Sequence, residues 1–380
     1  MKKILISIIA VAIFFACYTD SAYALELTAK SAILIDAASG KILFNQNSHE
    51  KLPVASTTKV LTGMLVLENV SDLHKTITIP EDFVNVGESG IYLAAGETLT
   101  YEDLLYAMLL CSANDAAQVL AVGVSGSEKD FVELMNQRTA ELGLTDSHWA
   151  NPHGLDAAEH YSSAYDLAMI ARAAAQIPEY NTIVSTYTWT IPWKSNEYDR
   201  VVYNHNQFLS SYEGADGMKT GYTSKSGNCL IASATKNGMR LISVILNSTD
   251  HYGETTQLMN YGFDNYSLSK VANKGKIVGS VKVVDGRDNA VDVVLGDDVY
   301  LVMKNDSRYS PDAVVNLPPS IKTPFDSDHT IGTIAYRDGD GNTVEFELFP
   351  AIDMDKYTFG GVLKLVWQKL WTVLLGDPAA

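Results

Sequence analysis

The sequence predicts an α+β protein, because strand-like and helix-like segments follow one another in a particular order. Alternating β-rich segments begin after residue 30 and return between residues 228 and 247, with helical patterns between them. Strands from both ends of such a region usually form one sheet that helices cover. From about residue 267 the helical pattern gives way to Val-rich alternation, which predicts a separate small β domain.

Each element has a local signal. Residues 31–47 are expected to form a hairpin that turns at Ala38-Ser39-Gly40, and an apolar helix follows from Pro53 and Ser56. Ser127 and Asp130 resemble a capping box at the start of another helix. The remaining expected elements are a helix from Glu102 to Leu110, strands from Asn228 to Thr235 and from Met239 to Asn247, and a closing helix from Glu254 to Asn265.

The first 24 residues have the pattern of a secretory signal peptide. Met1-Lys2-Lys3 precedes an apolar run from Ile4 to Phe15, and Ala22-Tyr23-Ala24 supplies a cleavage site before Leu25. The alternative is an uncleaved membrane anchor, although the apolar run is shorter than the ~20 residues that a span needs. We therefore expect an exported protein.

The net charge and the cysteine content limit the kinds of partner and of covalent cross-link that we expect. The formal net charge is −17, so a nucleic-acid partner is not expected. Cys111 and Cys229 remain after removal of the signal peptide. Export permits a disulfide, but two small buried thiols are the favoured interpretation.

The last segment, residues 356–380, is expected to form an amphipathic helix at a membrane surface. Between Gly361 and Leu375 apolar residues cover most of a helix, while Lys364, Gln368 and Thr372 form a narrow polar stripe. Such a helix is about 22 Å long, against a hydrocarbon core of about 30 Å, so it suits the interface better than a span. The alternative is a helix packed on the β domain.

Three short motifs, in one order, carry the chemistry: Ser56-Thr57-Thr58-Lys59, Ser112-Ala113-Asn114 and Lys219-Thr220-Gly221. Alone, Ser56 could be a helix cap and Lys59 an ordinary helix lysine. A spacing of three on a helix puts both on one face. A neutral lysine can take the proton of a serine hydroxyl, and burial beside the second cation of Lys219 would keep Lys59 neutral.

The second and third motifs supply the other groups that acyl transfer needs. Ser112 and Asn114, two apart on a turn, can relay a proton and hold a peptide bond. Lys219-Thr220-Gly221 is expected to begin a strand. Lys219 and Thr220 suit a carboxylate, and Gly221 allows a substrate backbone to approach this strand closely. The eight histidines form no metal-binding pair, and the 338–342 segment lacks the Gly and Glu of a calcium loop. No metal or other cofactor is therefore expected.

With these motifs, the chain resembles the low-molecular-weight penicillin-binding proteins that act as D-alanyl-D-alanine carboxypeptidases. The resemblance extends from about Ala29 to the C-terminus and includes Asn151-Pro152-His153-Gly154-Leu155 and Tyr161-Ser162-Ser163-Ala164-Tyr165-Asp166. It implies a β-lactamase/transpeptidase-like catalytic domain at 25–266, a small all-β domain at 267–355 and the terminal helix. It also implies a location at the outer face of the cytoplasmic membrane, in the cell-wall space.

The resemblance also implies roles for the site residues. Ser56 would attack the D-Ala-D-Ala bond of a peptidoglycan stem peptide, with Lys59 as base and Ser112 as proton relay. β-Lactams would acylate Ser56 as slow substrates. The remaining implied roles are substrate binding by Asn114, Lys219, Thr220 and Gly221, and an oxyanion hole formed by the backbone N–H groups of Ser56 and Tyr222.

One departure and two alternatives remain. Many relatives carry an arginine before the closing helix, whereas this chain has none between Arg240 and Lys270, and His251 lies nearest. A class A-like β-lactamase would share the three motifs but would need a dedicated Glu, and no match for one occurs near Asn151. A non-catalytic penicillin- or wall-binding protein is the alternative from another class.

Overall fold

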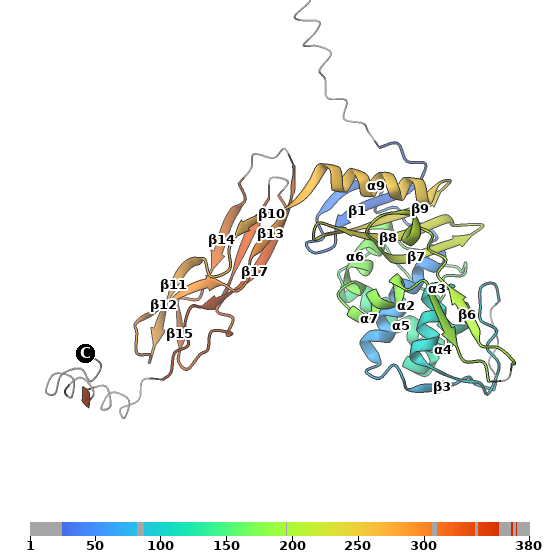
Figure 1. Cartoon of the computed structure of the whole chain (residues 1–380), viewed down its shortest axis with the longest axis horizontal. Helices are drawn as coiled ribbons and strands as arrows, with labels where there is room; N and C mark the ends of the chain where they lie inside the picture. Colours follow the sequence, from blue (N-terminus) through green and yellow to red (C-terminus); the bar gives the residue numbers. More distant parts are fainter. Residues whose placement is uncertain are drawn as a thin grey trace, which may run out of the picture.

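The computed structural model describes residues 25–81, 87–194, 196–305, 310–338 and 341–356, together with Val366, Trp367 and Leu370. The signal peptide predicted at 1–24 lies outside these residues, as does the predicted terminal helix apart from those three positions. Figure 1 shows an α+β body joined to an elongated β body. Within the described residues, no helix combines the length and the apolar character needed to cross a membrane.

A five-stranded antiparallel sheet is the centre of the α+β body. Its strand order, β2-β1-β9-β8-β7, pairs the first strand of the chain with one of the last strands of this body. The prediction that strands from both ends share one sheet is therefore confirmed. The strands are β1 (Ser31–Asp36), β2 (Ile42–Gln46), β7 (Ala215–Thr223), β8 (Gly227–Lys236) and β9 (Met239–Ser248).

Helices cover both faces of this sheet (Figure 1). Helix α9 packs on β8 and β9, while α6 packs on β1 and β9 from the other side. The helices are η1 (Ala55–Thr58), α2 (Lys59–Asn69), α3 (Tyr101–Leu110), α4 (Asn114–Ser125), α5 (Glu128–Glu141), α6 (Ala164–Ala174), α7 (Pro178–Ser185), α8 (Phe208–Ser211) and α9 (His251–Asn265). Two small hairpins pair β3 (Thr76–Thr78) with β4 (Thr98–Thr100), and β5 (Thr188–Ile191) with β6 (Arg200–Tyr203).

Side-chain caps fix where several helices begin. The Ser127 hydroxyl accepts a hydrogen bond from the backbone N–H of Asp130, as the capping pattern predicted. Thr100, Ser163 and Asp250 cap α3, α6 and α9 in the same way. Each such cap typically contributes about 1 kcal/mol, because it satisfies an otherwise unpaired helix N–H.

Helix α2 lies at the centre of the helical layer. It packs against α3, α4, α5, α6 and α7, and its residues from Lys59 to Val66 are all buried. A central helix of this kind is apolar on every side. Lys59 at its first turn is the exception, and a buried cation in such a place needs polar partners.

The β body confirms the Val-rich alternation seen in the sequence. Val281, Val293, Leu295, Ile334 and Leu348 form its core. A six-stranded sheet has the order β14-β16-β17-β12-β11-β15, and β10 pairs separately with β13. These strands are β10 (Tyr266–Ala272), β11 (Ile277–Val284), β12 (Ala290–Leu295), β13 (Val299–Lys304), β14 (Asp312–Asn316), β15 (Ser320–Lys322), β16 (Gly332–Arg337) and β17 (Thr343–Pro350).

A buried ion pair connects the two bodies. Lys41, before β2, lies 2.6 Å from a carboxylate oxygen of Asp338 after β16, and both side chains are less than a tenth exposed. Lys41 Nζ also donates to the carbonyl of Val302 at 3.3 Å. The N-terminal hairpin of the α+β body therefore contacts the β body directly.

Three expected boundaries differ from the structure. The α-helix predicted from Pro53 and Ser56 begins at Lys59, after a 3-10 turn at Ala55–Thr58. The closing helix starts at His251, not Glu254, because Asp250 caps it. Lys219-Thr220-Gly221 lies in the middle of β7, not at its beginning.

Candidate active site

Ser56 and Lys59 meet at the junction of η1 and α2. A 3-10 helix has 3.0 residues per turn, so side chains three apart lie directly above one another. Lys59 Nζ donates a 3.0 Å hydrogen bond to Ser56 Oγ. The 3-10 turn, which the sequence did not reveal, thus aligns the pair more closely than an α-helix would.

Lys59 has two further partners. Its Nζ donates to Asn114 Oδ1 at 2.7 Å and to the backbone carbonyl of His153 at 2.6 Å. Burial and the nearby charge of Lys219 hold the pKa of Lys59 well below its usual value. Lys59 therefore combines the position and the pKa shift of a proton acceptor for Ser56.

The loop that supplies the His153 carbonyl was not assigned a role from the sequence. A side chain at Gly154 would overlap the Ala55 carbonyl, and Gly154 has a φ of +88°. Glycine alone readily adopts this conformation. Burial lowers the pKa of His153 to about 3, so its imidazole is neutral at ordinary pH.

Asn114 connects the second motif to Lys59 and to a neighbouring segment. Its backbone N–H donates to Ser89 O at 2.8 Å, and Nδ2 donates to Gly87 O at 3.0 Å. The next residue, buried Asp115, accepts hydrogen bonds from the backbone N–H groups of Ile91 and Leu93. Asp115, which had no role in the sequence analysis, thus fixes the segment that borders the site.

Ser112 lies two residues before Asn114, in the short turn between α3 and α4. It is buried and has a φ of +65°, uncommon for a residue with a side chain. Within the described residues, no hydrogen bond joins its hydroxyl to Ser56 or Lys59. Its place beside the site follows from Asn114, two residues on, whose Oδ1 accepts a hydrogen bond from Lys59 Nζ.

The third motif lies on β7, which is an edge strand of the sheet. A Cβ on Gly221 would come within 3.1 Å of the Ser56 backbone nitrogen, so glycine is what lets β7 approach Ser56 this closely. Lys219 is buried, donates to the Thr220 carbonyl at 3.0 Å, and has its pKa lowered by burial to about 8. Thr220 is half-buried, and Tyr222 is 65% exposed.

The histidine near Lys219 is His205. It is not His251, which lies nearest in sequence to the place where many relatives carry an arginine. His251 is at the first turn of α9. The charge of Lys219 instead acts on His205, whose backbone N–H donates to Leu110 O at 3.0 Å. The sequence gives no sign that His205 lies near Lys219, because His205 follows the β5–β6 hairpin, which contains none of the three motifs.

Cys111 and Cys229 are free thiols; Cys229 is buried, as expected, whereas Cys111 is only partly buried. Burial raises the pKa of each to about 11. A thiol with a raised pKa is a poor nucleophile at neutral pH. Neither cysteine therefore competes with Ser56.

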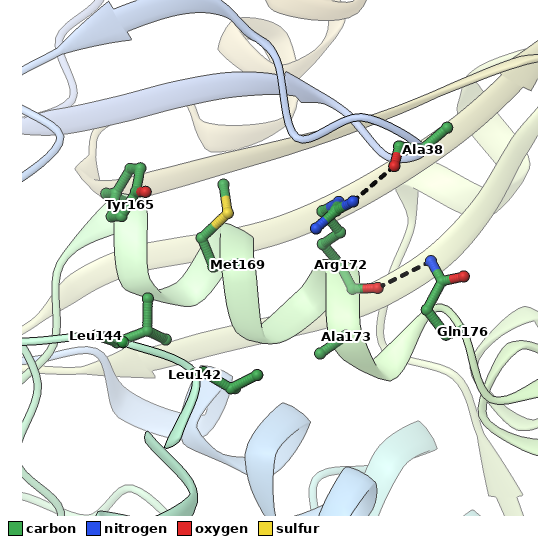
Figure 2. A pocket seen from close by; sticks show the side chains of 9 residues that line it. Ala38, Leu142, Leu144, Tyr165, Met169, Arg172, Ala173 and Gln176 are labelled. Atoms are coloured by element: carbon green, nitrogen blue, oxygen red, sulfur yellow. Dashed lines mark hydrogen bonds between the residues drawn. The ribbon is translucent and has the colours of Figure 1, made fainter. Parts of the chain in front are cut away.

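Two observations bear on competing sites elsewhere in the described chain. A hollow of about 410 Å³ lies beside α6, where Arg172 donates to the Ala38 carbonyl at 2.6 Å (Figure 2). Tyr165 and Met169 line it, and none of the predicted site residues does (Figure 2). Within the described residues, no three His, Cys, Asp or Glu side chains are grouped to hold a metal ion.

Comparison with known families gives two matches in chain order. Residues 18–250 match the family model "D-alanyl-D-alanine carboxypeptidase". Residues 266–356 match "Penicillin-binding protein 5, C-terminal domain". The first match lies in the α+β body, up to the start of α9, and the second lies in the β body.

Individual relatives and solved structures are similar to this chain over most of its length. D-alanyl-D-alanine carboxypeptidase DacF of Bacillus subtilis is 30% identical over 381 residues, covering 96% of this chain and 97% of the relative. DacA of Escherichia coli K12 is 32% identical over 336 residues, covering 84% and 82%. A Streptococcus pneumoniae structure, the peptidoglycan synthesis regulatory factor PBP3, superposes with a TM-score of 0.77 at 28% identity, covering 87% of this chain and all of that one. Penicillin-binding protein 5 of Haemophilus influenzae gives 0.71 at 28% identity, covering 87% and 98%.

Proposed function

The chain belongs to the D-alanyl-D-alanine carboxypeptidase family, and we propose that it removes the terminal D-alanine of peptidoglycan pentapeptide stems through an acyl-enzyme on Ser56. The observation that carries this proposal is the 3.0 Å hydrogen bond between Lys59 Nζ and Ser56 Oγ. The lowered pKa of that lysine supports it. A serine needs a base within such reach to become a nucleophile.

In the acylation step, Lys59 takes the Ser56 proton while Oγ attacks the carbonyl carbon of the D-Ala-D-Ala bond. The backbone N–H groups of Ser56 and Tyr222 stabilise the developing oxyanion, a contribution of about 3–4 kcal/mol per well-placed donor. The close approach of Gly221 to the Ser56 nitrogen supports this pairing. Ser112 passes the proton to the departing amine.

Substrate binding uses the second and third motifs. Lys219 and Thr220 receive the terminal carboxylate, because a buried cation without a carboxylate partner among the described residues favours an anion. The free edge of β7 offers backbone hydrogen bonds to an extended peptide. Asn114 holds the stem peptide, and water then releases the shortened stem.

A β-lactamase is less well supported. Among the described residues, the hydrogen-bond partners of Lys59 are Ser56, Asn114 and the His153 carbonyl, with no carboxylate at that distance. Class A enzymes depend on a Glu for deacylation. β-Lactams should therefore remain on Ser56 as slow substrates. A purely structural wall-binding protein would have no use for two buried lysines, which cost stability.

Domain division and location complete the proposal. We assign 25–266 to the catalytic domain and 267–355 to the β domain, with 1–24 as a signal peptide that directs export. Residues 356–380 would attach the protein to the outer face of the cytoplasmic membrane as an amphipathic helix. In support, the described Val366, Trp367 and Leu370 are 50%, 64% and 48% exposed, as an unburied apolar face requires.

The test is incubation of the mature chain with a synthetic pentapeptide stem ending in D-Ala-D-Ala. Mass spectrometry should find the tetrapeptide and one free D-alanine per turnover. A matched pentapeptide ending in D-Ala-L-Ala serves as the control and should stay intact. Persistence of the D-Ala-D-Ala stem at enzyme concentrations that still bind fluorescent penicillin would contradict the assignment.

A further inference from the structure

Strand β14 (Asp312–Asn316) is an exposed edge of the β body. It is the last strand of the six-stranded sheet and lies along one border of this body (Figure 1). Among the described residues, no strand other than β16 pairs with it. All five of its residues are exposed, including Val314 at 65% and Val315 at 38%. The outer side of such a strand presents backbone N–H and C=O groups that a further strand can bind.

The strand lacks the features that usually keep an edge from pairing. Natural edge strands carry a lysine, a proline, a bulge or an inward-pointing charge. Asp312, at the first position, is the only charged residue of β14. The register with β16 is continuous from Asp312 to Asn316, without a bulge. Prolines lie only outside the strand, at Pro311 and Pro318, so they limit the length of a ladder but do not interrupt it.

The inner face of β14 continues the apolar core of the β body. Val315 is in register with Ile334, and Ala313 with Tyr336. Residues in register across a sheet lie on the same face. Ile334 and Tyr336 are 2% and 4% exposed, so this face points into the core. The apolar layer therefore reaches the edge of the sheet, where Val315 and Ala313 leave it exposed.

We propose that β14 pairs with β14 of a second copy of this chain, antiparallel about a two-fold axis at Val314, so that the two six-stranded sheets become one. A two-fold dimer uses the same surface on both copies, so the strand must complement itself. In this register Ala313 lies opposite Val315 of the second copy and extends the apolar layer. Asp312 lies opposite Asn316, whose carboxamide can donate to the carboxylate, and no like charges face each other.

Other registers fit less well. A slip of one residue would place the core face of one copy beside the solvent face of the other. A slip of two residues moves the axis to Ala313 or to Val315. The first brings Pro311 into the ladder and the second brings in Pro318, and proline cannot donate to a ladder. The axis at Val314 pairs all five residues of β14.

The small size of this interface determines its strength. Five residues at about 3.4 Å each give an edge about 17 Å long, too short to bury the ~1,200 Å² of a stable interface. The pairing is therefore weak in dilute solution and increases with local concentration. Attachment of both copies to one membrane surface, as proposed for residues 356–380, would supply such a concentration.

Disulfide capture tests the pairing residue by residue. The full mature chain with Val314→Cys is mildly oxidised, both in concentrated solution and on liposomes of phosphatidylcholine and phosphatidylglycerol. Opposite residues of an antiparallel ladder have Cα atoms about 4.5–5.5 Å apart, within the roughly 4.4–6.8 Å range of disulfides. We expect a cross-linked dimer on a non-reducing gel, with peptide masses that place the bond between the two copies of position 314.

Neighbouring positions are the matched controls. Ala313→Cys and Val315→Cys, each alone, should give at least about fivefold less dimer than Val314→Cys, because each lies on a diagonal of about 7–8 Å from its counterpart. An equimolar mixture of the two should restore the cross-link. Adding Val315→Lys to Val314→Cys should lower the dimer yield about tenfold, because a charge enters the apolar layer. The wild-type chain, with Cys111 and Cys229, measures the background.

Each remaining outcome overturns the proposal. Equal cross-linking at the three positions would show random collision. The strongest link from Ala313→Cys or Val315→Cys alone would show a different register. No link at any position, in variants whose urea unfolding midpoints match the wild type, would leave the edge to solvent or to a different partner. If Val314→Cys itself unfolds, the mixture of Ala313→Cys and Val315→Cys tests the same register.

Discussion

The pKa of Lys219 predicts an alkaline limit to acylation by substrates that carry a free carboxylate. Burial lowers the pKa of Lys219 to about 8, so the protonated form needed to bind an anion is lost above that pH. At pH 9 about a tenth of Lys219 remains charged, and at pH 10 about a hundredth. The second-order rate constant for acylation should therefore fall about tenfold per pH unit above 8.

Substitutions of Lys219 distinguish this alkaline fall in the acylation rate from the titration of other groups. Lys219→Arg keeps its charge throughout this range, so whatever activity it retains should show no fall between pH 8 and 10. The pKa of Lys59 is lowered first by burial and then by the charge of Lys219, and Lys219→Met removes that charge. The pKa of Lys59 should rise, and the acid limb, where the base becomes protonated, should move to higher pH.

The assay is the rate of covalent modification by a penicillin, followed by intact mass from pH 5 to 10. The penicillin methyl ester is the matched control, since it has no carboxylate for Lys219 to bind. Its acylation should be slower and should lack the limb near pH 8. A flat profile for the free acid, or the same limb for the methyl ester, would refute the role of Lys219.

Three further predictions concern the base, the loop at Gly154 and the C-terminal segment. Lys59→Arg should lower penicillin acylation nearly as much as Lys59→Ala, by about 10²–10⁴-fold, because a guanidinium cannot act as base; a rate near wild type would place the base elsewhere. Gly154→Ala should cost about 1–3 kcal/mol of unfolding free energy in urea titrations and slow acylation, since the carbonyl of His153 must move; an unchanged acylation rate would remove this loop from the site. Deletion from Gly361 onward should abolish flotation with anionic liposomes while activity on soluble stems persists; equal flotation of both chains would identify a packing helix.

Sequence reasoning succeeded where residue type and spacing determine geometry. Ser56 and Lys59, three apart at a helix start, lie within hydrogen-bond distance. The alternation of Val residues after residue 267 did predict strands, because a half-buried strand alternates with period two. Both signals are local, so the rest of the fold does not change them.

The remaining parts of the site depend on long-range packing. The carbonyl of His153 contacts Lys59 across 94 residues of chain, and a backbone carbonyl has no residue-type signal. Gly154 is the sequence feature that could have pointed to close packing of this loop, because a side chain there would overlap the Ala55 carbonyl. Likewise, the proximity of His205 to Lys219 arises from how the β5–β6 hairpin folds back on α3, and no spacing rule predicts it.

The central claim is that Ser56 forms the acyl-enzyme with the D-Ala-D-Ala substrate, and one measurement tests it directly. The mature chain is quenched in acid during turnover of a pentapeptide stem, digested, and searched by mass for the acylated peptide. We expect the tetrapeptidyl ester on Ser56, the same position that penicillin labels, and neither adduct in Ser56→Ala. An adduct on any other residue, or D-alanine release that persists in Ser56→Ala, would contradict the account.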